Sequence, residues 1–280
     1  MRVLARNPER AAPLAALGAE VISGGLHDVA AMDSLVRDCD AIIHCAGVVR
    51  GSNIEQFRRI NTDGTRRLLA ARAAYCPDSR LLLVSSLAAR EPHLSWYAQS
   101  KREGEELVTR HEGNWCVVRP PAVYGPGDEE MQAIFDMMQR GFVLVPGRET
   151  AHNALVHVDD LVQALLACLT STGATGQVLT LSDGKPGGYD WRELADIGSQ
   201  VFKRPVRLVH PPSLLLGGVA LVNLLLSRIT GRAPMLTPKK LNELRFPDWT
   251  AENSDITART GWTPTIPLLQ GLQSLADSAL

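Results

Sequence analysis

The chain has 280 residues, of which 45% are hydrophobic and 21% charged, a composition typical of a globular protein with a sizeable core. Its formal net charge is −1, which offers no electrostatic footprint for nucleic acid or for a strongly anionic membrane. Five scattered cysteines without a Cys-x-x-Cys spacing favour buried, reduced thiols in a cytoplasmic protein over zinc or redox chemistry.

Short apolar runs alternate with helical patterns through the first half of the chain. The predicted strands are Arg2–Ala5, Glu20–Ile22, Ala41–Cys45, Leu81–Ser85 and Trp115–Arg119. The predicted helices between them are Pro8–Leu17, Val29–Val36, Ile54–Ala74 and Trp96–His111. This alternation predicts an α/β fold with a parallel sheet covered on both faces.

The pattern becomes mixed after Gly125-Pro126-Gly127. Helices are predicted over Met131–Arg140, Asp160–Leu169 and Trp191–Phe202, and a strand over Gln177–Leu181. We expect residues 126–280 to form mainly a smaller mixed α/β substrate lobe, with some segments returning to the sheet of residues 1–125.

One stretch, residues 214–226, is almost entirely apolar. Its thirteen residues fall short of the roughly 20 that a membrane-spanning helix needs. Two interpretations stay open, a buried or substrate-covering helix and peripheral contact with a membrane interface. The first ten residues carry three arginines and no long apolar run follows them, so we expect no secretory signal peptide.

Tyr97 and Lys101 form a Tyr-x-x-x-Lys pair on a predicted helix, where residues four apart share one face. A phenol has a reference pKa of about 10, and a neighbouring ammonium would lower it by favouring the ionised form. Ser86 ends the preceding strand-like run and adds a hydroxyl at the edge where open α/β sheets place ligands. Such a trio suits proton transfer to or from an alcohol or ketone.

Two nearby patterns have simpler interpretations. His44 lies inside an apolar strand, which indicates a hydrogen-bonded core histidine rather than a catalyst. His157-Val158-Asp159-Asp160 clusters possible metal ligands, but we expect a strand-to-helix junction in which an aspartate caps the following helix. No metal site is therefore predicted.

Several further motifs occur in a recognisable order: Ala41-Ile-Ile-His-Cys-Ala-Gly47, Asn61-Thr-Asp-Gly-Thr65, Arg119-Pro-Pro-Ala-Val-Tyr-Gly-Pro-Gly-Asp128, Val156-His-Val-Asp-Asp-Leu161 and Thr260-Gly-Trp-Thr-Pro264. Together with the Tyr-x-x-x-Lys pair they resemble the extended short-chain dehydrogenase/reductases, also called the NAD-dependent epimerase/dehydratase family. The resemblance implies a Rossmann-like doubly wound sheet in residues 1–125 that binds a dinucleotide. It assigns Tyr97 as general acid/base, Lys101 as its pKa-lowering neighbour and nicotinamide-ribose ligand, and Ser86, or alternatively Ser85, as donor to the substrate oxygen.

Members of that family open with a strand and a Gly-x-x-Gly-x-x-Gly turn that holds the cofactor pyrophosphate. This sequence begins with Arg2–Ala5, which resembles the family's second strand. We expect a sheet without its central strand, either because the chain is truncated or because it is a short form with weakened dinucleotide binding.

The resemblance also proposes cofactor contacts at Arg6, Asp28, Ala46, Gly47, Asn61, Ser85 and Pro120, beside Tyr97 and Lys101. Arg6 follows the second family strand, where an arginine suits the 2′-phosphate of NADP and an acidic residue would suit NAD. NADP is therefore favoured, with NAD as the alternative. Asp28 is expected near the adenine, whereas small Ala46 and Gly47 would let the backbone approach the cofactor.

Three functions fit these features. The first is an NAD(P)-dependent oxidoreductase that acts on a small, hydrophobic hydroxy or keto substrate. The alternatives are a nucleotide-sugar epimerase, which Arg148 alone supports weakly, and a non-catalytic NAD(P)-binding scaffold or regulator. By analogy with the family, the helices of Ile54–Ala74 and Trp96–His111 would form a homodimer interface.

Overall fold

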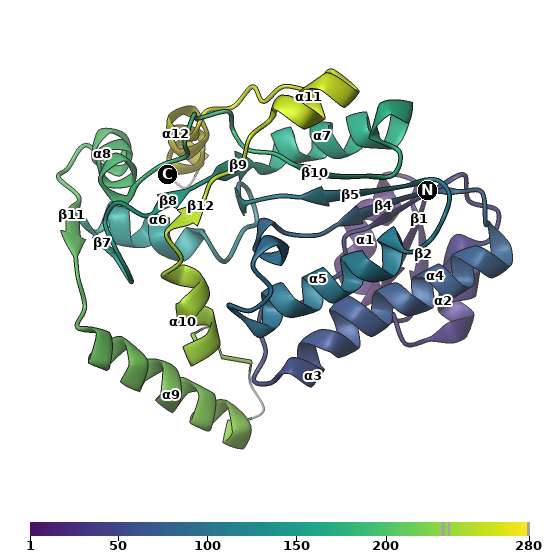
Figure 1. The fold of residues 1–280 in the computed structure, drawn as a ribbon, viewed down its shortest axis with the longest axis horizontal. Helices are drawn as coiled ribbons and strands as arrows, with labels where there is room; N and C mark the ends of the chain where they lie inside the picture. The colour runs from purple at the N-terminus through teal and green to yellow at the C-terminus, as the bar shows by residue number, and fades with distance from the viewer. Residues whose placement is uncertain (231–232, 235, 279–280) are drawn as a thin grey trace.

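The computed structural model describes residues 1–230, 233–234 and 236–278. Its centre is a parallel sheet with the strand order β10-β5-β4-β3 (Figure 1). These strands are β3 (Ala41–His44), β4 (Arg80–Val84), β5 (Trp115–Arg119) and β10 (Gln177–Thr180). The α/β class and the parallel pairing that the sequence predicts are confirmed.

The first two strands form a sheet of their own. Strands β1 (Arg2–Ala5) and β2 (Glu20–Ser23) pair in parallel, and no strand of the described residues joins them to β3. Strand β3 therefore forms an edge of the central sheet with no strand beside it among the described residues, and Ile43 is 43% exposed there. This separation matches the expectation of a sheet that lacks a strand between β1 and β3.

Strands β4 and β5 are buried on both faces, because their apolar residues point alternately to each side. Leu81 and Leu83 pack with helices α2 (Val29–Val36), α4 (Asp63–Tyr75) and α5 (Trp96–Thr109). Leu82 points the other way, toward α7 (Val158–Thr170) and α11 (Ser254–Thr260). The predicted first helix is a 3₁₀ turn, Pro8–Ala11, that continues as α1 (Ala12–Ala16).

The predicted helix Ile54–Ala74 is helical but not uniform. It consists of α3 (Ile54–Phe57), a π-helical turn η2 (Arg58–Thr62) and α4. Such turns insert an extra residue into a helix and are frequent at functional sites. The π turn carries Asn61, one of the expected site residues.

A second lobe has its own core around Tyr124, Leu155, Trp191 and Leu268. Its helices are α6 (Gln132–Gln139), α8 (Trp191–Val201), α9 (Ser213–Thr230), α10 (Pro238–Leu244) and α12 (Leu268–Ser278). Its strand pairs are β6 (Ala122–Tyr124) with β9 (Leu155–His157), β7 (Phe142–Leu144) with β11 (Arg207–Val209), and β8 (His152–Asn153) with β12 (Asp248–Trp249). Strand β10 leaves this lobe and joins the edge of the central sheet.

The expectation that an aspartate caps the helix after residue 157 is wrong. His157 is the cap of α7, because its Nδ1 accepts a hydrogen bond from the backbone N–H of Asp159 at 3.2 Å. Asp160 instead accepts hydrogen bonds from the backbone N–H groups of Thr265 and Ile266. Its carboxylate thereby fixes the segment that leads into α12.

Helix α9 is not buried, so the buried form of the first expectation for residues 214–226 is wrong, whereas a substrate-covering role stays a prediction. Among its described side chains, Ala220, Leu224 and Ser227 form a buried stripe, and seven leucines and valines are exposed. Figure 1 shows α9 at the margin of the molecule, far from the sheet and connected onward to α10. Within the described residues, no helix combines the length and the apolar character needed to cross a membrane.

All five cysteines are free thiols. Cys76, Cys116 and Cys168 are buried as expected, whereas Cys39 is half-buried and Cys45 is exposed at the end of β3.

Gly104 in α5 packs against the π turn. A Cβ added there would lie 2.9 Å from the backbone oxygen of Asn61, so an alanine cannot be accommodated without moving α5. We predict that Gly104→Ala lowers the free energy of unfolding by about 1–3 kcal/mol, although alanine is the better helix former. Gly217→Ala in α9, where no atom lies within 4 Å, is the matched control and should be neutral or stabilising in urea unfolding. Equal effects of the two substitutions would contradict the packing argument.

His44 in β3 is buried and its Nε2 lies 3.0 Å from Thr65 Oγ1. Burial, helped by the charge of Lys101, lowers the pKa of His44 to about 4. Between pH 6.5 and 4 the unfolded chain therefore binds a proton that the folded chain does not, and stability falls as pH falls. We predict a loss of about 3 kcal/mol over this window that His44→Gln removes. His111→Gln, at an exposed position, should leave the pH dependence of unfolding unchanged, and an unchanged profile in His44→Gln would refute the assignment.

Candidate functional site

The expected catalytic residues converge where strand β4 ends and helix α5 begins. Strand β4 ends at Val84, so Ser85 and Ser86 follow directly at its carboxyl edge. The Ser86 hydroxyl accepts a hydrogen bond from the backbone N–H of Ala88 and so begins the 3₁₀ turn η3 (Leu87–Arg90). Ser95 caps α5 in the same way, because its hydroxyl accepts a hydrogen bond from the backbone N–H of Ala98. The helix then begins at Trp96, one residue before Tyr97.

Lys101 is anchored to the end of the sheet. Its Nζ donates a hydrogen bond of 2.8 Å to the backbone carbonyl of Val84. Burial lowers the pKa of Lys101 to about 8, because an ammonium loses hydration there. An ammonium has three N–H donors, so it retains hydrogen-bonding capacity toward a ligand beside β4.

Tyr97 lies one turn earlier and contacts Ser86. A hydrogen bond with the Ser86 side chain lowers the pKa of the Tyr97 phenol, but burial acts more strongly and raises it to about 12. The expectation that Lys101 lowers this pKa is therefore wrong. The physical reason is that desolvation of the phenol dominates, while the ammonium of Lys101 is directed at the Val84 carbonyl. Tyr97 is thus protonated at neutral pH.

The two adjacent serines occupy different environments. Ser85 is 4% exposed, and its hydroxyl has no hydrogen-bond partner among the described residues. Only the Ser86 hydroxyl contacts Tyr97. The backbone carbonyl of Pro120 accepts a hydrogen bond from the N–H of Leu87, so buried Pro120 fixes the segment that carries both serines.

Gly47 and Asn61 complete the cluster from the side of β3. Asn61 is 4% exposed. Its side-chain oxygen accepts a hydrogen bond from the N–H of Val48, and its side-chain nitrogen donates to the carbonyl of Val48 and to the hydroxyl of Ser100. These bonds connect the loop after β3 to α5. A Cβ at Gly47 would lie 3.2 Å from Asn61 Oδ1 and 3.7 Å from Lys101 Nζ. Ala46 and Gly47 are exposed, so their backbone is open to a ligand that approaches Lys101.

Arg6 and Asp28 lie at the separate β1–β2 sheet rather than in this cluster. Arg6 is exposed just after β1, and its stem packs beside Gly25. The Asp28 carboxylate caps α2 by accepting a hydrogen bond from the N–H of Ala31. Asp28 therefore has a structural partner, whereas Arg6 presents its guanidinium at the carboxyl end of β1.

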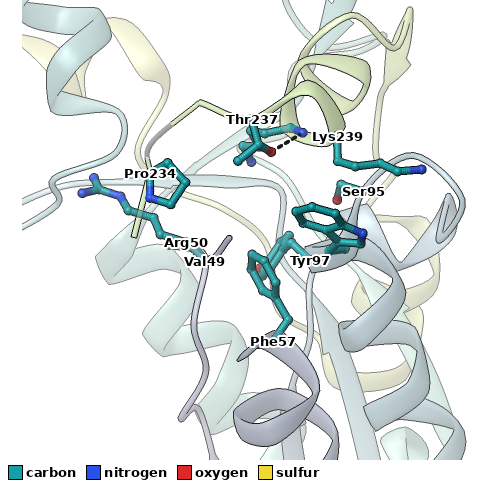
Figure 2. A pocket seen from close by; sticks show the side chains of 11 residues that line it. Val49, Arg50, Phe57, Ser95, Tyr97, Pro234, Thr237 and Lys239 are labelled. Atoms are coloured by element: carbon teal, nitrogen blue, oxygen red, sulfur yellow. Dashed lines mark hydrogen bonds between the residues drawn. The ribbon is translucent and has the colours of Figure 1, made fainter. Parts of the chain in front are cut away.

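A cleft opens over the ring of Tyr97, between α3 and the segment that leads into α10. Figure 2 shows Phe57 below the Tyr97 ring and Pro234 and Thr237 on the opposite wall. The walls combine apolar and basic side chains, and the lining residues are Val49, Arg50, Gly51, Phe57, Ser95, Trp96, Tyr97, Pro234, Thr237, Lys239 and Lys240. No acidic residue lines this cleft in the part of the chain that the structure describes.

Sequence reasoning missed the contribution of α10. Lys240 Nζ lies 5.6 Å from the centre of the Tyr97 ring and pairs with Glu243, whose carboxylate also accepts a hydrogen bond of 2.5 Å from the Ser95 hydroxyl. Glu243 is buried. A lysine and a glutamate at positions 240 and 243 look like an ordinary helical ion pair, so only the packing of α10 on α5 could identify them.

The cluster fits the nicotinamide-ribose end of a dinucleotide. Lys101 offers ammonium donors, Ser85 an unpartnered hydroxyl, and Ala46-Gly47 an open backbone without a large side chain. The fit is incomplete at the pyrophosphate end, because the described residues contain no Gly-x-x-Gly-x-x-Gly turn after a strand.

Comparison with known proteins agrees with these motifs. Residues 1–181 match the family described as "NAD dependent epimerase/dehydratase family". A ceramide reductase of Caulobacter vibrioides is 39% identical over 240 residues, which cover 85% of this chain and 74% of that protein. A 4-hydroxy-2-methyl-3-oxo-4-farnesyl-3,4-dihydroquinoline-1-oxide ketoreductase of Stigmatella aurantiaca is 28% identical over 208 residues, or 66% of this chain and 61% of that protein.

The fold is shared with solved structures. RMD from Pseudomonas aeruginosa, complexed with NADPH, superposes with a TM-score of 0.69 at 20% identity and covers 99% of this chain and 98% of that chain. The Rossmann-like architecture that the motifs imply is thereby confirmed. The chain belongs to the NAD-dependent epimerase/dehydratase family, an NAD(P)-binding family of extended short-chain dehydrogenase/reductases.

Proposed function

We propose that the protein is an NAD(P)-dependent oxidoreductase that reduces a keto group, or oxidises a hydroxyl group, on a small apolar substrate. The observation that carries this proposal is the contact with Ser86 of Tyr97, which lines a cleft and lies one helical turn from the buried ammonium of Lys101. A phenol, a hydroxyl and an ammonium at the carboxyl edge of a parallel sheet suit carbonyl reduction.

Each residue has a role in the reductive direction. When bound, the nicotinamide cofactor supplies the hydride. Ser86 donates a hydrogen bond to the substrate carbonyl oxygen, and Tyr97, protonated because its pKa is about 12, transfers its phenolic proton to that oxygen. Lys101 is bonded to the Val84 carbonyl and would hold the nicotinamide ribose through its remaining N–H donors. Asn61 holds the loop of Ala46 and Gly47 against α5.

An apolar substrate is favoured over a nucleotide sugar. Phe57, Trp96 and Pro234 line the cleft, and exposed helix α9 directly precedes its wall. The names of the Caulobacter and Stigmatella relatives refer to a ceramide and to a farnesylated quinoline, which both carry long apolar chains. Arg148, the one arginine that supported a nucleotide-sugar epimerase, is not among the cleft residues. We also propose that residues 214–226 contact a membrane that holds such substrates. The protein itself would lie in the cytoplasm.

NADP is the proposed cofactor because Arg6 places an unshielded guanidinium after β1. A competing role is that of a non-catalytic NAD(P)-binding scaffold, which the separation of the β1–β2 sheet from β3 among the described residues favours. Titration with NADPH, followed by nicotinamide fluorescence, separates these roles. Binding of NADPH together with its oxidation by an apolar ketone supports the oxidoreductase, whereas binding without turnover, or no binding to the folded chain, favours the scaffold.

Removing the phenolic hydroxyl tests the catalytic assignment. We predict that Tyr97→Phe lowers kcat for reduction of a long-chain ketone by roughly 100- to 10,000-fold while NADPH binding is retained. The loss follows because the ring still fills the cleft but no proton donor remains. The readout is NADPH consumption at 340 nm together with fluorescence titration.

Tyr75→Phe is the matched control, because Tyr75 bonds Asp33 far from the cleft. It should keep wild-type turnover. Turnover of UDP-sugars by the wild-type protein, with no reduction of any apolar ketone in a panel, would instead support an epimerase. Undiminished kcat in Tyr97→Phe would refute the role of the phenol.

Removing the Arg6 guanidinium tests the cofactor preference. We predict that Arg6→Ala raises the Kd for NADPH roughly tenfold to a hundredfold and leaves the Kd for NADH almost unchanged, because only NADPH carries the 2′-phosphate. Exposed Arg10 offers the control Arg10→Ala, which should change neither value. Equal weakening of both cofactors would exclude Arg6 as the 2′-phosphate ligand.

A further inference from the structure

Helix α9 exposes an unusually large apolar surface for the margin of a folded lobe. Seven of its leucine and valine side chains are between 44% and 92% exposed: Leu214, Leu215, Val219, Leu221, Val222, Leu225 and Leu226. Exposed apolar surface of this kind in a folded protein marks an interaction site.

One side of α9 is already occupied. Ala220, Leu224 and Ser227 are buried, and α10 packs against α9. Because positions 220, 224 and 227 follow the helical repeat, they form one stripe along the helix. The exposed leucines and valines lie outside this stripe, and Figure 1 shows α9 at the margin of the molecule, where a partner could cover them while α9 stays attached to its lobe.

The charge around α9 indicates which partner this is. Between Asp196 and Glu243 the sequence contains no acidic residue and seven basic ones: Lys203, Arg204, Arg207, Arg228, Arg232, Lys239 and Lys240. The net charge of the whole chain is −1 because acidic residues elsewhere balance the basic residues of this segment. Apolar helix faces flanked by basic residues are typical of peripheral binding to anionic lipid, where the two contributions add.

One wall of the cleft follows α9 in the chain. Residues Pro234, Thr237 and Lys239, which follow α9 in the chain, form one wall of the cleft above Tyr97 (Figure 2). A substrate that leaves a lipid layer beside α9 would reach Tyr97 along this wall.

We propose that α9 docks the protein on the surface of an anionic lipid bilayer, with its outward leucines in the interfacial layer and the catalytic cleft opening beside the lipid. The delivery of an apolar substrate rests on the proposed oxidoreductase function, whereas the docking itself does not.

Vesicle flotation of the full chain, without cofactor or substrate, tests the docking. We expect binding to vesicles of phosphatidylcholine with 30% phosphatidylglycerol that is at least roughly tenfold tighter than to phosphatidylcholine alone, and that weakens as salt is raised. Leu221→Gln/Leu225→Gln should reduce this binding by roughly tenfold or more, since both side chains are about half exposed and leave the buried stripe intact.

The matched control is Val162→Gln/Leu166→Gln, an exposed apolar pair with the same i,i+4 spacing on α7. It should bind vesicles like the wild type, and so should Tyr97→Phe, which keeps docking separate from catalysis. The proposal is overturned if wild-type protein does not float with anionic vesicles, or if the α7 and α9 pairs have equal effects. It is also overturned if light scattering shows a stable dimer that Leu221→Gln/Leu225→Gln dissociates while vesicle binding persists.

Discussion

The hydrogen bond from Lys101 to the carbonyl of Val84 fixes the geometry on which the candidate site depends. It holds an ammonium at the carboxyl edge of the central sheet, where burial lowers the lysine pKa to about 8. Because Tyr97 lies one helical turn away on α5, the same bond sets the position of the phenol relative to Ser86. The site is therefore a consequence of how α5 is docked on strand β4.

Three further contacts hold α5 in that position. Arg119 of β5 donates two hydrogen bonds, of 2.8 and 2.5 Å, to the carboxylate of Glu105. Both side chains are largely buried, and the bidentate geometry fixes the orientation of the two groups. Gly104 allows close approach to the π turn, and Ser100 bonds Asn61. Ser95, at the start of α5, bonds Glu243 of α10 and so connects the second lobe to α5. Lys240 of the same helix α10 lies 5.6 Å from the centre of the Tyr97 ring.

Much of this arrangement could be predicted from sequence because its signals are local. The alternation of apolar runs predicted β1 to β5 to within one residue at each end but missed the short strand β6, and the spacing of Tyr97 and Lys101 identified α5 as the helix of the candidate site. The features that could not be predicted from the sequence depend on burial or on contacts between segments far apart in the chain. The raised pKa of Tyr97 follows from desolvation, and the pairing of Ser95 with Glu243 joins residues 148 positions apart. The His157 cap was missed because the neighbouring aspartates are the more usual capping residues. The predicted homodimer through α4 and α5 stays a prediction.

The most direct test of this account is the titration of Lys101 by NMR of protein labelled with ¹³C and ¹⁵N in its lysines. The structure predicts one lysine that titrates near pH 8 and whose signal is lost in Lys101→Arg, because the ammonium is buried against the Val84 carbonyl. If every lysine titrated at its ordinary value of about 10.4, Lys101 would be solvated, and the buried site described for Tyr97 and Ser86 would be contradicted.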